Sequence, residues 1–366
     1  MIRILYVVLG TALNGTERYV VDLAENLPRD EFKVFIATPQ KSDLSEYLKK
    51  AELEEFVFEN GDKNAFSFRG LKNIYRFIRE KKIDIIHSNS GILPCLIGKF
   101  SSSRISFETR HGLFYTMKQL ENLPLKRKII EKVKQYFSDF QIAISYNDKE
   151  MLKKYFGIKE EKIKVIYNGI DENKFTQYRK ATGSSSEELI KLVNVGRLTF
   201  QKAQDILLES VRKLKDEFTD FHLTIIGEGE DKFKLENYIE KYSLQKYVRI
   251  EKYRKDLFEY LQNFDILVMS SRYEGVPYVM LESMAIGLPV IMTDVGGIGN
   301  VIENGVSGLI IKEGSTDELK DAILTLSKDK KLFCELQINA IVTLSKYTIK
   351  NMIENYMHLY KSTLEY

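Results

Sequence analysis

Short apolar runs, rich in β-branched residues, alternate with longer stretches of helical periodicity from the first residues onward. This alternation is typical of βαβ units, in which helices join parallel strands and cover both faces of the sheet. The sequence therefore predicts an α/β protein built from doubly wound parallel sheets. The expected strands lie near residues 2–9, 32–38, 54–58, 83–87, 105–110, 140–144, 163–167, 189–195, 222–227, 247–250, 266–270, 289–293 and 308–311.

The chain is long enough for two domains. It has 366 residues, more than one hydrophobic core usually organises. Periodicity fails over 172–188, where Thr182-Gly183-Ser184-Ser185-Ser186 has the composition of a linker. We therefore expect a first Rossmann-like domain over 1–171, a linker over 172–188 and a second Rossmann-like domain over 189–346, with a cleft between the domains. Residues 347–366 carry a helical apolar face that could close either domain.

Composition and charge exclude several classes of protein. A formal net charge of +3 is small for this length and gives no support to a nucleic-acid partner. Cys95 and Cys334 show no metal-type spacing, so we expect reduced thiols and a cytoplasmic location. The apolar start, Met1–Gly10, is interpreted as a first buried strand, and no run approaches the roughly 20 apolar residues that span a bilayer.

The most informative stretch runs from Arg272 to Glu282. An expected strand ends before it, a Gly275-Val276-Pro277 turn follows, and a helix is expected to begin near Tyr278. Glu274 then lies in the loop and Glu282 about one turn inside the helix. Carboxylates are bidentate acceptors for vicinal hydroxyls, and a sugar nucleotide presents one such set on its hexose and another on its ribose. The two acids could instead be exposed glutamates at a helix terminus.

A second candidate element follows the first strand of the second domain. Gly196-Arg197 and Lys202 place two cations at the carboxyl end of a parallel strand, where open α/β sheets bind ligands. Arginine offers a planar fork of donors to phosphate oxygens and lysine a point charge. Two solvated loop cations are the alternative interpretation.

A glycine turn opens the first helix of the chain. Gly15 follows the first strand, and backbone N–H groups at a helix N-terminus favour an anion. A lone glycine at such a turn is weak evidence by itself. A full Gly-x-Gly-x-x-Gly fingerprint and a Walker loop are both absent, which argues against a nicotinamide oxidoreductase and a P-loop ATPase.

With these elements the chain resembles the retaining GT-B glycosyltransferases of family GT4 over nearly its whole length. The resemblance implies a GT-B fold, with two Rossmann-like doubly wound domains facing a central cleft and the last helix returning to the first, acceptor-side domain. Further matching motifs are Arg110-His111-Gly112, Asn168-Gly169-Ile170-Asp171, Asp294-Val295-Gly296-Gly297 and Asn304-Gly305-Val306-Ser307-Gly308-Leu309.

The resemblance also assigns residue roles. Arg197 and Lys202 would bind the diphosphate, Glu274 the donor sugar and Glu282 the ribose, while His111 would lie near the reacting centre. Backbone N–H groups at Gly15 and Gly297 are further candidates to stabilise the leaving phosphate. The expected catalytic residues are Glu274, His111, Arg197 and Lys202; the expected donor-binding residues are Gly15, Gly196, Arg197, Lys202, Glu274, Gly275, Val276, Glu282, Gly296 and Gly297.

The expected activity is transfer of a hexose-type sugar from a UDP- or GDP-sugar to a glycan or lipid-linked acceptor, in cell-surface polysaccharide biosynthesis. No Asp-x-Asp triplet occurs in the chain, so we expect a metal-independent enzyme without a cofactor. Retention of anomeric configuration is implied by the resemblance alone. A GT-B-fold nucleotide-sugar epimerase and a catalytically silent accessory subunit are the alternative functions.

A basic amphipathic segment follows Pro124. It combines apolar residues with five cations, and such a helix can lie on anionic lipid headgroups. A solvated helix that covers the first domain is the alternative, and both interpretations are open at this point. The five cations are Lys126, Arg127, Lys128, Lys132 and Lys134.

Overall fold

The computed structural model describes residues 1–60, 66–101, 103–113, 115–183, 189–254 and 256–365. The chain forms two compact units. Unit 1 contains Met1–Asn168 together with the chain from Ile349 onward, and unit 2 contains Gly169–Thr348. Residues 172–178, which the sequence suggested as the start of a linker, form a 3₁₀ helix in unit 2, where Phe175 is buried against Phe258. The remainder of that expected linker includes residues 184–188, which lie outside the described residues.

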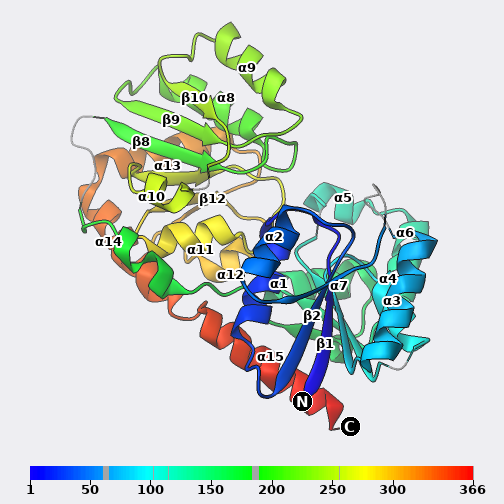
Figure 1. The fold of residues 1–366 in the computed structure, drawn as a ribbon. Coiled ribbons are helices and arrows are strands. Elements are labelled where there is room, and N and C mark those ends of the chain that lie inside the picture. Colours follow the sequence, from blue (N-terminus) through cyan, green and yellow to red (C-terminus); the bar gives the residue numbers. More distant parts are fainter. Residues whose placement is uncertain (61–65, 102, 114, 184–188, 255, 366) are drawn as a thin grey trace. The chain divides into compact units, whose positions relative to one another are not determined.

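Unit 1 is a doubly wound α/β domain (Figure 1). Its seven strands are all parallel, in the order β3-β2-β1-β4-β5-β6-β7. The strands are β1 (Ile2–Val7), β2 (Phe32–Thr38), β3 (Glu54–Val57), β4 (Ile85–Ser88), β5 (Ile105–Arg110), β6 (Phe140–Ala143) and β7 (Ile163–Val165). The helices are α1 (Gly15–Asn26), α2 (Asp43–Lys50), α3 (Phe68–Lys81), α4 (Leu93–Lys99), α5 (Met117–Glu121), α6 (Leu125–Lys134), α7 (Tyr146–Phe156), η1 (Glu160–Lys162) and α15 (Ile349–Leu364).

Unit 2 repeats this architecture with six parallel strands, in the order β10-β9-β8-β11-β12-β13. The strands are β8 (Ile190–Val195), β9 (Phe221–Ile226), β10 (Val248–Glu251), β11 (Ile266–Met269), β12 (Val290–Thr293) and β13 (Leu309–Ile311). The helices are η2 (Glu172–Tyr178), α8 (Gln204–Leu214), α9 (Lys232–Lys241), α10 (Leu257–Leu261), α11 (Tyr278–Ala285), α12 (Ile298–Val301), α13 (Thr316–Lys328) and α14 (Lys330–Leu344).

The predicted fold class is confirmed. Every strand expected from the sequence is present, with ends displaced by no more than about two residues. Such strands can be read from sequence because both faces are buried, which requires nearly continuous apolar runs. In β11, for example, all of Ile266–Met269 is buried.

Strand β1 shows how the two faces of the first sheet are divided. Side chains alternate along a strand, so Leu5 and Val7 share one face and Tyr6 the other. Leu5 and Val7 join a core cluster with Ile74 and Ile78 of α3. Tyr6 instead lies on the face covered by α15, where its hydroxyl bonds that of Tyr360 at 3.0 Å. The last helix is thus part of the core of unit 1.

A buried hydrogen-bond chain joins α15 to the sheet. His87 lies between α15 and β5, with its Nδ1 2.6 Å from the Tyr360 hydroxyl and its Nε2 2.6 Å from Thr109 Oγ1. The Tyr19 hydroxyl bonds both Thr109, at 3.4 Å, and the Tyr356 hydroxyl of α15. Burial lowers the pKa of His87 to about 3, so its imidazole is neutral. Figure 1 shows α15, in red, beside the blue strands β1 and β2.

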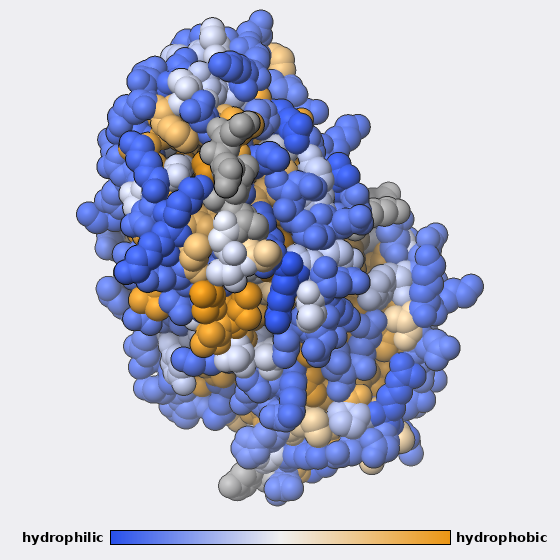
Figure 2. Space-filling model, turned by 90° about the vertical axis from the view of Figure 1, so that its left-hand side faces the viewer, coloured by the Kyte–Doolittle hydropathy of each residue, from blue (hydrophilic) through white to orange (hydrophobic). Residues whose placement is uncertain are grey.

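On the face shown in Figure 2, hydrophilic side chains predominate and apolar side chains gather in one region. Among the described residues, no helix is both long and apolar enough to cross a membrane.

We expect the buried His87 to make unit 1 sensitive to acid. An unfolded histidine takes up a proton near pH 6.5 and His87 only near pH 3, so between these values the unfolded state binds more protons. The stability contributed by neutral His87 is therefore complete above pH 6.5 and is lost as the pH falls toward 3. In urea unfolding followed by circular dichroism, the stability advantage of the wild type over His87→Gln should shrink by roughly 1 kcal/mol per pH unit.

Thr109→Val is the matched control. It removes a hydrogen bond from the same chain without removing a titratable group, so its stability difference from the wild type should stay constant with pH. A His87→Gln difference that also stays constant between pH 7 and pH 5 would show that His87 titrates normally.

Candidate functional site

The candidate residues of unit 2 lie where the strand order reverses. Strand β8 pairs with β9 on one side and with β11 on the other, and chain order changes direction between β8 and β11. Open α/β sheets bind ligands outside the carboxyl ends of strands at such a switch point. The loop from Gly196 to Ala203 follows β8, and the loop from Ser270 to Pro277 follows β11. Parallel pairing of these two strands brings both loops to one edge of the sheet.

Lys202 and Glu274 meet at this edge. The Lys202 ammonium lies 2.5 Å from Glu274 Oε1, and both side chains are largely enclosed, with 15 % and 6 % of their surfaces exposed. The Ser271 hydroxyl donates to the same carboxylate oxygen at 2.6 Å. The pair therefore presents one cation and one acceptor carboxylate at a single point, which suits a ligand that carries both phosphate and hydroxyl groups.

Arg197 is held in the same loop by a glutamine. Its guanidinium donates to Gln201 Oε1 at 3.1 Å, and the Gln201 amide donates to the Tyr273 carbonyl at 3.2 Å. The amide of Gln204 in turn donates to the Arg197 carbonyl at 3.1 Å. The sequence did not single out these glutamines or Ser271. The partner of Gln201, the Tyr273 carbonyl, lies 72 positions away. Gln204 and Ser271 have partners seven and three positions away, but their residue types form no distinctive pattern there.

A close contact at Gly296 sets the distance between the loop after β12 and the loop after β11. Gly296 has φ +59°, and a Cβ added there would stand 1.8 Å from the Glu274 carbonyl oxygen. Only glycine fits both the left-handed backbone and this approach. Gly296 thus positions the backbone of Glu274.

One predicted donor in this region has a partner within the protein. Gly297 was expected to offer its backbone N–H to a leaving phosphate, but that N–H donates to the Gly275 carbonyl at 3.0 Å. The bond holds the loop after β12 against the loop after β11, and the N–H is already used. The Gly297–Gly275 hydrogen bond therefore has a structural role in joining these two loops.

Glu282 lies within α11, as the sequence predicted, and is 3 % exposed. Val276, in the preceding turn, is 2 % exposed. Glu282 and Glu274, which is 7 % exposed, are therefore not the exposed glutamates of the alternative interpretation. The assignment of Glu282 to a ribose stays a prediction.

In unit 1, Gly15 and His111 lie at corresponding strand ends. Gly15 is the first residue of α1, and a Cβ added there would meet nothing within 4 Å, so its backbone is open to approach. His111 follows β5, and its Nε2 lies 2.9 Å from Asn89 Oδ1. Since an amide oxygen only accepts, the Nε2 atom carries the proton and Nδ1 is left as an acceptor. Burial lowers the pKa of His111 to about 3, so it is neutral.

Tyr19 connects His111 to the interior. Its ring meets the His111 ring edge-on, with the centroids 4.7 Å apart. His87, at the corresponding end of β4, is instead fully buried in the hydrogen-bond chain under α15. Packing against α15 determines this difference, and the residue pattern alone does not indicate which face of the sheet α15 covers.

Asp148 is a further residue that the sequence reasoning missed. It is buried at the start of α7, accepts from the Ser145 hydroxyl at 2.6 Å and interacts with the backbone of Leu113, two residues after His111. Burial raises its pKa to about 6. The Ser145-x-x-Asp148 spacing is a helix N-terminus signature that could have revealed it.

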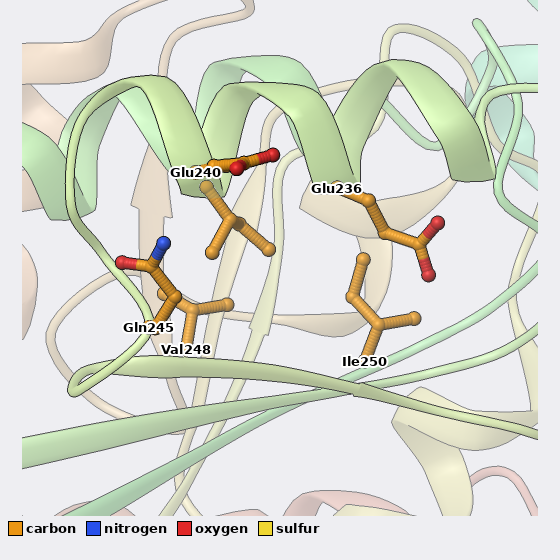
Figure 3. Close-up of a pocket in the computed structure, with 6 residues that line it drawn as sticks. Glu236, Glu240, Gln245, Val248 and Ile250 are labelled. Carbon is orange, nitrogen blue, oxygen red and sulfur yellow. The ribbon is translucent and has the colours of Figure 1, made fainter.

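Among the described residues, one hollow lies away from this site. A shallow hollow lies between α9 and β10, where Glu236 and Glu240 stand over Val248 and Ile250 (Figure 3). Its two carboxylates would repel a diphosphate. Within the same described ranges, no group of three or more His, Cys, Asp or Glu side chains could hold a metal ion.

Comparison with known families agrees with this geometry. Residues 175–342 match the model "Glycosyl transferases group 1", and residues 13–174 match "Glycosyltransferase Family 4". This chain belongs to the group 1 glycosyltransferases. It is therefore a glycosyltransferase with the GT-B fold, and the matches favour this activity over the epimerase and silent-subunit alternatives.

Named relatives share most of the chain. A UDP-Gal:alpha-D-GlcNAc-diphosphoundecaprenol alpha-1,3-galactosyltransferase of Escherichia coli is 26 % identical and aligns with 90 % of this chain and 89 % of its own. The Escherichia coli O-antigen biosynthesis glycosyltransferase WbnH is 25 % identical over 98 % of both chains. Anabaena Alr3699/HepE, solved with UDP-glucose, has a TM-score of 0.83 at 20 % identity, covering 99 % of this chain and 100 % of its own.

We expect Gly296→Ala to damage the site of this glycosyltransferase. The new methyl group would overlap the Glu274 carbonyl and would also adopt an unfavourable φ. Thermal unfolding should shift by several degrees, and the transfer rate should fall at least about tenfold as Glu274 moves.

Gly305→Ala separates backbone strain from overlap. Gly305 has φ +75°, but a Cβ there would meet nothing within 4 Å. It should show the smaller destabilisation of about 1 kcal/mol that positive φ alone produces. Equal effects of the two substitutions on activity would contradict the positioning role of Gly296.

Proposed function

We propose that this glycosyltransferase transfers a hexose from a nucleoside-diphosphate sugar, with UDP-sugars and GDP-sugars as the candidate donors. The observation that carries the proposal is the Lys202–Glu274 pair at the switch point of the second sheet. A sugar nucleotide offers a diphosphate and a set of vicinal hydroxyls within reach of one such pair. The names of the galactosyltransferase relative and of the UDP-glucose complex support a uridine donor in particular.

In the proposed mechanism, cations stabilise the diphosphate as the glycosidic bond breaks. Arg197 and Lys202 bind its oxygens, and their positions are fixed before reaction by Gln201 and Glu274. Preorganised charge of this kind avoids reorganisation during the reaction. Glu274 binds the hydroxyls of the sugar and Glu282 the ribose. In unit 1, the Nδ1 atom of neutral His111 accepts a hydrogen bond from a sugar hydroxyl.

We further propose that transfer retains the anomeric configuration and needs no metal. Retention rests on membership of the family alone, and product NMR would establish it. Metal independence is supported by the two cations at the site, which can neutralise a diphosphate without a divalent ion. The proposed acceptor is a glycan or a lipid-linked glycan of cell-surface polysaccharide biosynthesis, reached from the cytoplasmic face of the membrane. The names of the Escherichia coli relatives support this acceptor class.

Arg197→Ala tests the proposed role of the cations. The guanidinium bonds Gln201, and removing one preorganised donor should lower kcat by roughly 10²–10³-fold, with little change in thermal stability. Lys331→Ala, on a side chain that is 86 % exposed in α14, is the control and should keep full activity. An Arg197→Ala enzyme within twofold of the wild type would rule out a role in diphosphate departure.

Metal independence and donor identity can be measured together. Thermal unfolding with UDP-, GDP- and ADP-sugars should show stabilisation by one nucleotide class, because a ligand that binds only the folded state raises stability by mass action. Radiolabelled transfer from that donor should continue after EDTA treatment. Activity that disappears with EDTA and returns only with Mn²⁺ or Mg²⁺ would overturn this part of the proposal.

A further inference from the structure

Helix α6 lies on unit 1 in an unusual orientation. A surface helix of an α/β domain normally buries its apolar stripe and exposes its charged face. In α6 the only buried residue is Glu131, which is 4 % exposed. Its large apolar residues are on the outside: Leu125, Ile129, Ile130 and Val133 are 73 %, 53 %, 39 % and 45 % exposed.

Ion pairs explain why Glu131 is inside. The Arg110 guanidinium, at the end of β5, lies 3.2 Å from Glu131 Oε2, and the Lys134 ammonium lies 2.8 Å from Oε1. Arg127 approaches the same carboxylate at 3.5 Å. Although burial alone would raise the pKa of Glu131, these cations lower it, so the carboxylate stays charged. Helix α6 is therefore attached to unit 1 largely through charge.

The outer face has a regular pattern. Leu125, Ile129 and Val133 are spaced by four residues and form one stripe on the side opposite Glu131. At the end of the helix Tyr136, 56 % exposed, extends the stripe. On a helix of 3.6 residues per turn, Lys126 and Lys132 flank this stripe on its two sides.

The five basic residues of this segment thus fall into two sets. Arg127 and Lys134 hold Glu131 and belong to the attachment of the helix. Among the described residues, the structure shows no ion pair for Lys126, Lys128 or Lys132 within 4.0 Å. The sequence had grouped all five as one cationic surface. In the second set, Lys126 and Lys132 are exposed beside the apolar stripe, whereas Lys128 is half-buried.

We propose that α6 is a membrane-insertion helix, whose apolar stripe enters the acyl boundary of an anionic lipid surface while Lys126 and Lys132 contact the headgroup phosphates. An amphipathic helix in this position buries its apolar face by about 5–10 Å, and its cations are attracted to the negative leaflet. The inference deepens the proposed action on a lipid-linked acceptor and rests on that proposal for its biological role.

Charge favours lipid over a second copy of the chain. A symmetric pair of α6 helices would bring the same unpaired lysines together, because a two-fold contact places like residues near like. A stable protein interface also needs about 800 Å² from each partner, more than one ten-residue helix offers. An anionic bilayer can bury the apolar stripe in its acyl region and pair the flanking lysines with its headgroup phosphates.

Binding to vesicles tests the inference without any enzyme assay. The protein should co-sediment with phosphatidylcholine vesicles that contain roughly 30 % phosphatidylglycerol. It should co-sediment much less with vesicles of pure phosphatidylcholine. Leu125→Ser, Ile129→Ser and Val133→Ser together should weaken binding at least about tenfold. The control is Ile338→Ser with Val342→Ser on α14, two side chains that are 50 % and 64 % exposed, which should bind like the wild type.

Two further variants separate the two sets of cations. Lys126→Gln with Lys132→Gln should weaken binding and make it insensitive to salt. Arg127→Gln with Lys134→Gln should retain anionic-vesicle binding, with any loss of thermal stability measured separately. If both double variants lost vesicle binding equally, the two sets of cations would not differ in function. All five would then act as one cationic surface.

Insertion can be measured directly because the chain contains no tryptophan. Tryptophan in Ile129→Trp should shift to the blue on anionic vesicles and become shielded from aqueous quenchers, whereas Ile338→Trp should not change. Wild-type protein that ignores anionic vesicles, or that forms a dimer abolished by the triple serine variant, would overturn the inference. Transfer from a sugar nucleotide to a soluble acceptor would then still be intact, so failure of insertion and failure of the proposed function are distinguishable.

Discussion

Lys202 and Glu274 meet because β8 and β11 are paired in parallel. Parallel pairing places the carboxyl ends of both strands at the same edge, so two loops about seventy residues apart in sequence become neighbours. The Gln201 bond to the Tyr273 carbonyl joins the same two loops. Gly296 then brings the loop after β12 against Glu274. The positions of all these groups depend on the register of the sheet.

The sequence predicted the strands and the two Rossmann-like units because these depend on local pattern. It could not predict side-chain contacts across strands. The Gly275–Gly297 backbone bond shows this limit: a glycine-rich motif suggested an open N–H group, whereas the structure uses that group internally. Gln201 could not be identified for a related reason, since its partner, the Tyr273 carbonyl, lies 72 positions along the chain. Ser271 lies only three positions before its partner Glu274, but a serine close to a glutamate is too common a pattern to indicate a site.

Helix α6 shows a different limit. The periodicity of its residues indicates an amphipathic helix but cannot say which face is turned inward. A surface helix normally buries its apolar side. Helix α6 buries Glu131 instead, because the Arg110 guanidinium at the end of β5 forms an ion pair with that carboxylate. Arg110 is itself paired with the buried Glu108. The ion pairs of Arg110 with Glu108 and Glu131 therefore determine which face of α6 is turned toward the sheet, and only the folded structure shows them.

Helix α15 has a consequence for how the chain is made. Tyr356 and Tyr360 complete the buried chain that contains Tyr6, Tyr19 and His87, although all of unit 2 separates them in sequence. During synthesis the strands of unit 1 emerge first, but the groups that satisfy their buried polar atoms emerge after unit 2. Unit 1 can therefore complete its buried hydrogen-bond chain only after α15 has been synthesised. Unit 2 is fully synthesised before that point and can fold first.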